Sequence, residues 1–175
     1  MNYQEISIDN ANHGVPEERV GGVSVAEWRF EMEAGNKAFA TGKLDLAASH
    51  YQRSVRVAEE LIRLSEDGHV DPGCAARAMF EARRNLSENY LRLGCIDDAV
   101  EALETGFMQI CLRAAWPCTP GTVRKACVRK ITDCLTEFVS LLERVHAPPA
   151  KILSAYALAD EAQAQWRNLE SAAWT

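Results

Sequence analysis

Residues 34–55 have the sequence AGNKAFATGKLDLAASHYQRSV, in which Gly42 separates two segments of helical character. The first segment opens at Ser24, where Glu27 three residues later completes a capping box. The second segment extends to about Ser65 and carries apolar side chains at a helical period, namely Leu44, Ala47, Tyr51, Val55, Ala58 and Ile62. Helices joined by so short a turn are neighbours in space, so this stretch predicts an antiparallel helical hairpin.

Four more helical segments follow, each bounded by residues that break helices. The third is capped by Asp71, with Pro72 at its first position, where a missing N–H has no cost, and it ends at Gly94. The fourth follows that glycine, the fifth follows WPCTPG (116–121), and the sixth follows HAPP (146–149). No window alternates polar and apolar residues with a period of two, so we expect no β-sheet and an all-α fold.

The turns recur at equal intervals along the chain. Gly42, Gly94 and His146 are each 52 residues apart, and Ala47 and Ala99 keep the same offset after their turns. An internal repeat of this kind is typical of a solenoid, in which each unit covers the apolar face of its neighbour. The sequence therefore predicts three antiparallel helical hairpins built from six main helices.

The first hairpin resembles a tetratricopeptide repeat (TPR). It has the residues of that family's key positions, namely Gly35, Ala38, Gly42, Ala47 and Tyr51. Small residues at 35, 38 and 47 would let the two helices approach closely, and Tyr51 would fill the seam beyond them. Residues 85–107 are a second match, and the third hairpin matches in helical pattern only. The resemblance covers roughly residues 25–165 and implies a TPR-like right-handed superhelix, whose concave groove binds a peptide or a helix of a partner protein.

The repeat is longer than that of the family, whose period is about 34 residues. The excess is about 18 residues, or about five helical turns. We expect the extra turns to lengthen the far ends of adjoining helices, around residues 60–78 and 110–128.

Charge and hydropathy limit the partners and the location of the chain. Its 19 basic and 25 acidic residues give a formal net charge of −6. Such a chain repels phosphate, which disfavours nucleic acids and anionic membranes as partners. No apolar run approaches the roughly 20 residues that span a bilayer. Because no basic and apolar signal segment opens the chain, we expect a cytoplasmic protein, with a flexible N-terminal leader at 1–22 and a TPR-like helical domain at 23–175.

The cysteines and histidines show no pattern of a metal or catalytic site. None of the six cysteines forms a Cys-x-x-Cys pair, and the four histidines are scattered. Cys127 and Cys134 are seven residues apart on one helical face, where thiols serve as small core side chains. No Gly-rich phosphate loop, His-Glu-x-x-His or Gly-x-Ser-x-Gly motif occurs. We therefore expect most cysteines to be buried and reduced, with no metal, no cofactor and no catalysis.

Candidate binding residues come from the carboxylate clamp, with which some TPR proteins grip carboxylates. Asn36 and Asn85 match its two asparagine positions, and Lys125 and Arg129 have the spacing of its Lys-x-x-x-Arg pair. Amides and cations in this combination donate hydrogen bonds to carboxylates.

Two positions depart from the clamp pattern. Met32 stands where the clamp has a further lysine, and a count from the third turn places Glu137 where the clamp has its arginine. A milder hypothesis is that Arg84, Lys125 and Arg129 line the groove together with the two asparagines and favour an acidic peptide. The alternative is that these cations form a solvated helix face with acidic neighbours.

The function predicted from the sequence is a non-catalytic protein-interaction module, an adaptor or a chaperone. Two other classes stay open, a self-assembling structural protein and an enzyme on a helical scaffold. The aromatic end of the chain has two interpretations as well. Trp166, Leu169 and Trp174 either cap the third hairpin or form the surface of a homodimer or of a partner complex.

Overall fold

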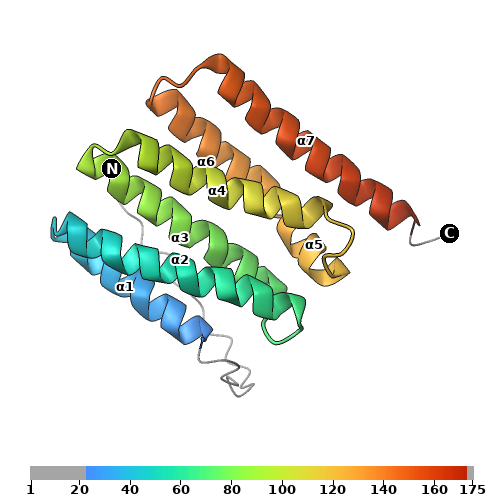
Figure 1. Cartoon of the computed structure of the whole chain (residues 1–175), viewed down its shortest axis with the longest axis horizontal. Coiled ribbons are helices and arrows are strands. Elements are labelled where there is room, and N and C mark those ends of the chain that lie inside the picture. Colours follow the sequence, from blue (N-terminus) through green and yellow to red (C-terminus); the bar gives the residue numbers. More distant parts are fainter. Residues whose placement is uncertain (1–22, 173–175) are drawn as a thin grey trace.

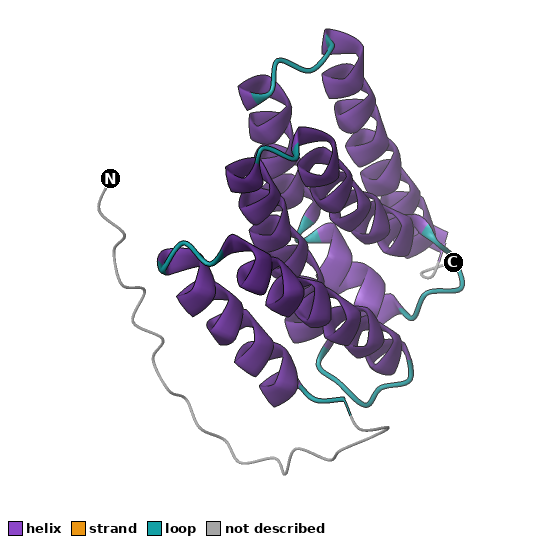
Figure 2. Cartoon of the chain, turned by 60° about the vertical axis from the view of Figure 1, so that its left-hand side comes forward, coloured by secondary structure: helices purple, strands orange, loops and turns teal. Residues whose placement is uncertain are grey.

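A computed structural model of the chain describes residues 23–172, and the expected leader at 1–22 and Trp174 lie outside that range. Seven helices make up this part of the chain: α1 (Val25–Ala40), α2 (Leu44–Glu66), α3 (Pro72–Leu93), α4 (Ile96–Ala115), α5 (Gly121–Val128), α6 (Ile131–Arg144) and α7 (Pro149–Ala172). No β-strand occurs among the elements of residues 23–172, so the expected all-α fold is confirmed there (Figure 2).

Two of the helices, α1 and α3, begin where the capping residues of the sequence place them. Ser24 accepts a hydrogen bond from the backbone N–H of Glu27 at 3.1 Å, at the start of α1. Asp71 accepts one from the backbone N–H of Cys74 at 2.7 Å, at the start of α3. Both bonds satisfy donors that a helix leaves without partners in its first turn.

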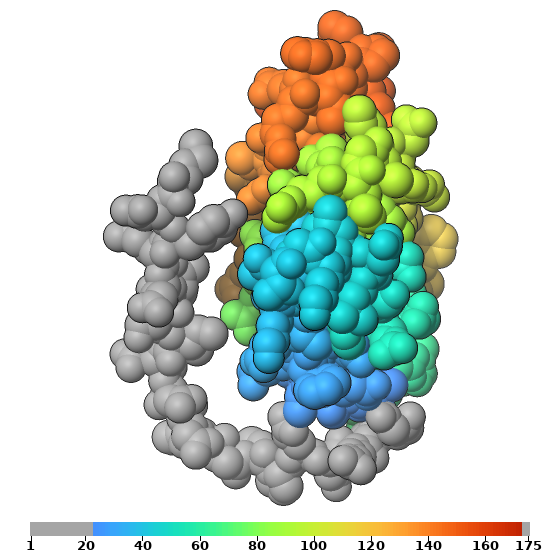
Figure 3. Space-filling model, turned by 90° about the vertical axis from the view of Figure 1, so that its left-hand side faces the viewer, coloured from blue at the N-terminus to red at the C-terminus, as the bar shows by residue number. Residues whose placement is uncertain are grey.

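Three short turns lie at one end of the molecule and join α1 to α2, α3 to α4, and α6 to α7 (Figure 1). Each turn contains one residue in the left-handed region: Gly42 at φ 73°, Gly94 at φ 79° and His146 at φ 54°. In each case the next residue donates its N–H to a carbonyl five residues back, as in a Schellman motif. His146 therefore takes the conformation that glycine takes in the other two turns. Figure 3 shows the molecule from this end, where the colours follow one another in chain order from blue to orange.

The helices pack in sequence order, so the core extends from one end of the stack to the other. α2 packs on α1 and α3, α4 packs on α3, α6 and α7, and α7 covers α4 and α6 (Figure 1). Alanines supply many of the contacts, and Phe107 and Phe138 stack with ring centroids 5.6 Å apart between α4 and α6. Trp166 and Leu169 of α7 are half-buried.

The extra residues of the long repeat are used in two ways. Around 60–78 they lengthen α2 and α3, as the sequence predicted. Around 110–128 the outcome differs, because the single helix expected after Thr119 is divided into α5 and α6. The N–H of Lys130 bonds to the carbonyl of Cys127, three residues back, at 2.8 Å. This tight turn redirects the chain, so α5 also contacts α3, and the described part has seven helices instead of the six expected.

Replacing His146 with glycine should stabilise the fold. A side chain in the left-handed region costs about 1–2 kcal/mol, and glycine removes this cost. Part of the gain is offset, because glycine loses more backbone entropy on folding. We expect a net gain of roughly 0.5–1 kcal/mol in the free energy of unfolding, measured by urea denaturation. The matched control is His69→Gly, because His69 is an exposed turn residue without a positive φ. An equal gain from both substitutions would contradict this account of His146.

Candidate functional site

A large cavity of the described residues lies on the face formed by α1, α3 and α6, and we call it the groove. Its volume is about 660 Å³. The lining residues come from these three helices, with one residue each from α2 and α4 at the floor: Asn36, Phe39, Ala40, Tyr51, Arg84, Asn85, Ser87, Glu88, Leu91, Arg92, Leu103, Glu137, Ser140, Leu141 and Arg144. The first helix of each helix pair thus supplies most of the wall.

An amide pair joins α1 to α3 across the groove. The hydroxyl of buried Tyr51 donates to Oδ1 of Asn36 at 2.8 Å, and Nδ2 of Asn85 donates to the same oxygen at 3.1 Å. Burial raises the pKa of Tyr51 to about 12, so this hydroxyl keeps its proton at neutral pH. Asn36 is exposed and Asn85 is half-buried, so both amides border the open groove.

A close contact between α1 and α2 positions the tyrosine. A Cβ added at Gly35 would lie 2.6 Å from Cε1 of Tyr51 and 2.7 Å from its Cδ1. An added Cβ would overlap the ring, so the close approach of α1 and α2 that the sequence predicted from small residues is present at Gly35. The ring therefore lies close to α1, where its hydroxyl reaches the side chain of Asn36, the residue after Gly35.

Charged side chains line the groove above its apolar floor. Arg144 donates to Glu88 at 3.1 Å, and Arg84 lies 4.0 Å from Glu137. The guanidinium of Arg92 stacks on the ring of Phe39. Its carbon atom Cζ lies 4.7 Å from the ring centroid. Both ion pairs are about half exposed, so each contributes little to stability.

The structure brings together three of the five residues expected to bind a partner. Asn36, Asn85 and Arg84 line the groove. Lys125 and Arg129 do not line the groove, in which the sequence had placed them. They line a separate cavity of about 570 Å³ beside Asp71, Pro72, Gly73 and α5. The turn between α5 and α6 is the cause, because it directs this part of the chain toward the start of α3.

The cations that replace them in the groove are Arg92 and Arg144. The 52-residue interval would have identified both, because it leads from Ala40 to Arg92 and then to Arg144. The same interval leads from Asn36 to Glu88 and Ser140, which also line the groove. Applying the repeat to the first hairpin's groove residues is therefore the sequence signal that was missed.

All six cysteines are free thiols, and three are buried: Cys111, Cys127 and Cys134. Burial raises the pKa of Cys111 and of Cys127 to about 12, and it raises the pKa of Cys134 as well. Cys95 and Cys118 are exposed and Cys74 is half-buried, so the expectation that most cysteines are buried is correct for only half of them.

Within residues 23–172, no group of three or more His, Cys, Asp or Glu side chains is arranged to hold a metal ion. In the same part of the chain, none of the helices has the length and hydropathy that crossing a membrane requires.

Replacing Gly35 with alanine should disturb both the core and the groove. The new methyl group would overlap the ring of Tyr51, and overpacking of this kind costs about 1–3 kcal/mol. We expect a loss of that size in the free energy of unfolding, measured with urea. At Gly121 an added Cβ has its nearest neighbour, the side chain of Arg124, at 3.8 Å, so Gly121→Ala is the matched control and should cause no loss. Unchanged stability in Gly35→Ala would show that α1 and α2 can separate without cost.

Comparison with known proteins places the chain in one family. A family model with the description "Protein of unknown function (DUF2753)" matches residues 26–171. The match covers most of the chain, so the chain belongs to this family. No curated protein and no solved structure matches it.

Proposed function

We propose that this member of the DUF2753 family is a non-catalytic protein-interaction module, an adaptor or chaperone that binds a peptide segment of a partner in the groove. The proposal includes a TPR-like right-handed superhelix of three hairpins, of which α1, α3 and α6 form the concave side. The supporting observation is the groove itself, in which an amide pair and arginines stand above an apolar floor.

The amide pair suits the backbone of a peptide. Oδ1 of Asn36 already accepts two hydrogen bonds, which leaves Nδ2 of Asn36 as a donor and Oδ1 of Asn85 as an acceptor. Neither atom has a hydrogen-bond partner within residues 23–172. An extended peptide presents one carbonyl and one N–H per residue, so it can satisfy both atoms at once.

The apolar floor suits a side chain of the partner. Tyr51, Leu103 and Leu141 are buried below the groove, and Leu91 and Phe39 are half-buried at its side. A cavity of about 660 Å³ that combines this apolar floor with polar and charged groups at its rim has room for an apolar anchor of a partner. We also propose a cytoplasmic location, because six free thiols suit a reducing compartment.

The second candidate function is self-assembly, which a stripe of exposed apolar residues favours. Met108, Leu112 and Trp116 follow one another along the outer side of α4. On α7, the C-terminal helix that was considered for a homodimer, Leu153 and Tyr156 are exposed. A stable dimer buries about 800 Å² on each partner, whereas these sets contain only three and two exposed side chains. Sedimentation velocity distinguishes the two functions. We expect a monomer at micromolar concentration, and a stable oligomer would favour self-assembly.

Replacing Asn85 with alanine should weaken peptide binding and leave the fold intact. The change removes an acceptor for the peptide backbone and the bond to Asn36, but it empties no part of the core. We expect about a tenfold rise in Kd, on the scale of one hydrogen bond. The measurement is fluorescence anisotropy with a labelled heptapeptide selected on the wild-type protein from a random display library.

The matched control for this test is Lys125→Ala. Lys125 was expected to bind the partner but lies outside the groove, so its replacement should leave Kd unchanged. A large fall in melting temperature in Asn85→Ala with binding intact would show Asn85 to be structural. Equal losses of binding in both variants would show that the peptide is not confined to the groove.

A further inference from the structure

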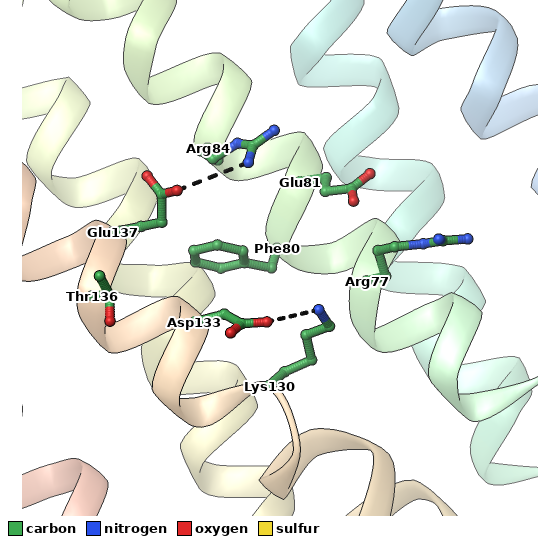
Figure 4. A pocket seen from close by; sticks show the side chains of 8 residues that line it. All are labelled: Arg77, Phe80, Glu81, Arg84, Lys130, Asp133, Thr136 and Glu137. Carbon is green, nitrogen blue, oxygen red and sulfur yellow. Dashed lines mark hydrogen bonds and ion pairs between the residues drawn. The ribbon is translucent and has the colours of Figure 1, made fainter. Parts of the chain in front are cut away.

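A second cavity extends the groove along α3. It has a volume of about 310 Å³ and lies between α3 and α6. Figure 4 shows the ring of Phe80 at its centre, between the Arg84–Glu137 pair and the Lys130–Asp133 pair. Arg84 and Glu137 line this cavity and the groove alike, so the two cavities meet at one ion pair.

The ion pair between Arg84 and Glu137 separates the two cavities only weakly. The nearest atoms of Arg84 and Glu137 are 4.0 Å apart, and their side chains are 46% and 49% exposed. A contact at this distance and exposure is readily exchanged for a better one. A carboxylate brought by a partner can therefore replace Glu137 as the neighbour of Arg84 and connect the two cavities.

Three arginines on α3 follow the combined cleft, and we call Arg77, Arg84 and Arg92 the arginine row. All three are exposed and line one or both cavities. From the rise of a helix, Arg77 and Arg84 are about 10.5 Å apart along the axis, and Arg84 and Arg92 are about 12 Å apart. No carboxylate of residues 23–172 forms an ion pair with Arg77 or Arg92.

Acidic residues alternate with this row on the same helix. Glu81 stands between the first two arginines and Glu88 between the last two, so the sign of charge changes along the cleft. A polymer with a negative charge on every unit would meet repulsion at Glu81 and Glu88. A peptide with neutral residues between its carboxylates would not. The alternation therefore favours spaced acidic residues over a nucleic-acid backbone, which the net charge of −6 also disfavours.

We infer that the cleft takes an extended acidic peptide segment of another protein, about seven residues long, whose carboxylates recur every three or four residues. The length follows from the arginine row, which spans about 22 Å, and from the rise of an extended chain, about 3.3 Å per residue. The central carboxylate binds Arg84 in place of Glu137, and the outer two meet Arg77 and Arg92. This inference rests on the proposed function and specifies the partner for the same site.

The test uses an array of heptapeptides that are randomised at one position at a time, with acetylated and amidated ends so that only side chains carry charge. The wild-type protein should select Asp or Glu at positions three or four apart. In Arg84→Glu the central position should change its preference to Lys or Arg, and the original peptides should bind at least about tenfold more weakly. The outer positions should keep their acidic preference. The control Arg129→Glu makes the same charge change outside the cleft and should leave the selection unaltered.

The outcomes separate this inference from the proposed function. If four-residue peptides bind as well as heptapeptides, and Arg77→Ala and Arg84→Glu have no effect, the inference of an extended acidic segment is wrong. A loss of binding in Asn85→Ala would still support the groove as the binding site. If no peptide binds, or if Asn85→Ala leaves the Kd unchanged, the proposed function fails as well. Tighter binding of a dT10 oligonucleotide than of any peptide would overturn both. Thermal melts of each variant check that the fold is retained.

Discussion

The contact between Gly35 and the ring of Tyr51 is the constraint from which the binding face follows. The absence of a side chain at position 35 lets α1 and α2 approach until the ring lies against the backbone of α1. The hydroxyl then reaches Asn36, and Asn36 holds Asn85 on α3. One close helix contact in the core therefore places the amide pair where α1 and α3 border the groove. A larger residue at 35 would act on the groove through this chain of contacts.

The electrostatics of the cleft depend on how α6 lies beside α3. The turn at Lys130 lets α5 contact α3, while α6 runs along the cleft and brings Glu137 and Arg144 opposite Arg84 and Glu88. The resulting ion pairs are exposed and weak. They therefore keep the cleft polar and hydrated without closing it. The same turn removes Lys125 and Arg129 from the cleft. The geometry of one turn thus decides which cations a partner would meet.

Much of the fold could be predicted from the sequence because its signals are local. Ser24 and Asp71 cap their helices, and the 52-residue interval identified His146 as a turn residue without any glycine there. The division between α5 and α6 could not be predicted, since no Gly or Pro marks it and the apolar stripe of Cys127 and Cys134 continues across it. That turn accompanies the packing of α5 against α3, a long-range contact that no local sequence pattern reveals. The site was predicted in part for the same reason: Asn36, Asn85 and Arg84 lie before the turn, whereas the expected cations lie beside it.

The most direct test of the central claim, that partners bind on the face of α1, α3 and α6, is site-specific photocrosslinking. A photoreactive amino acid replaces Ser140, an exposed residue of the groove, or Thr122, an exposed residue of the cavity beside α5. Each variant is irradiated with the acidic heptapeptide that the wild-type protein selects, and the products are mapped by mass spectrometry. The account predicts crosslinks from position 140 and none from position 122. Crosslinks from position 122 with none from position 140 would contradict it.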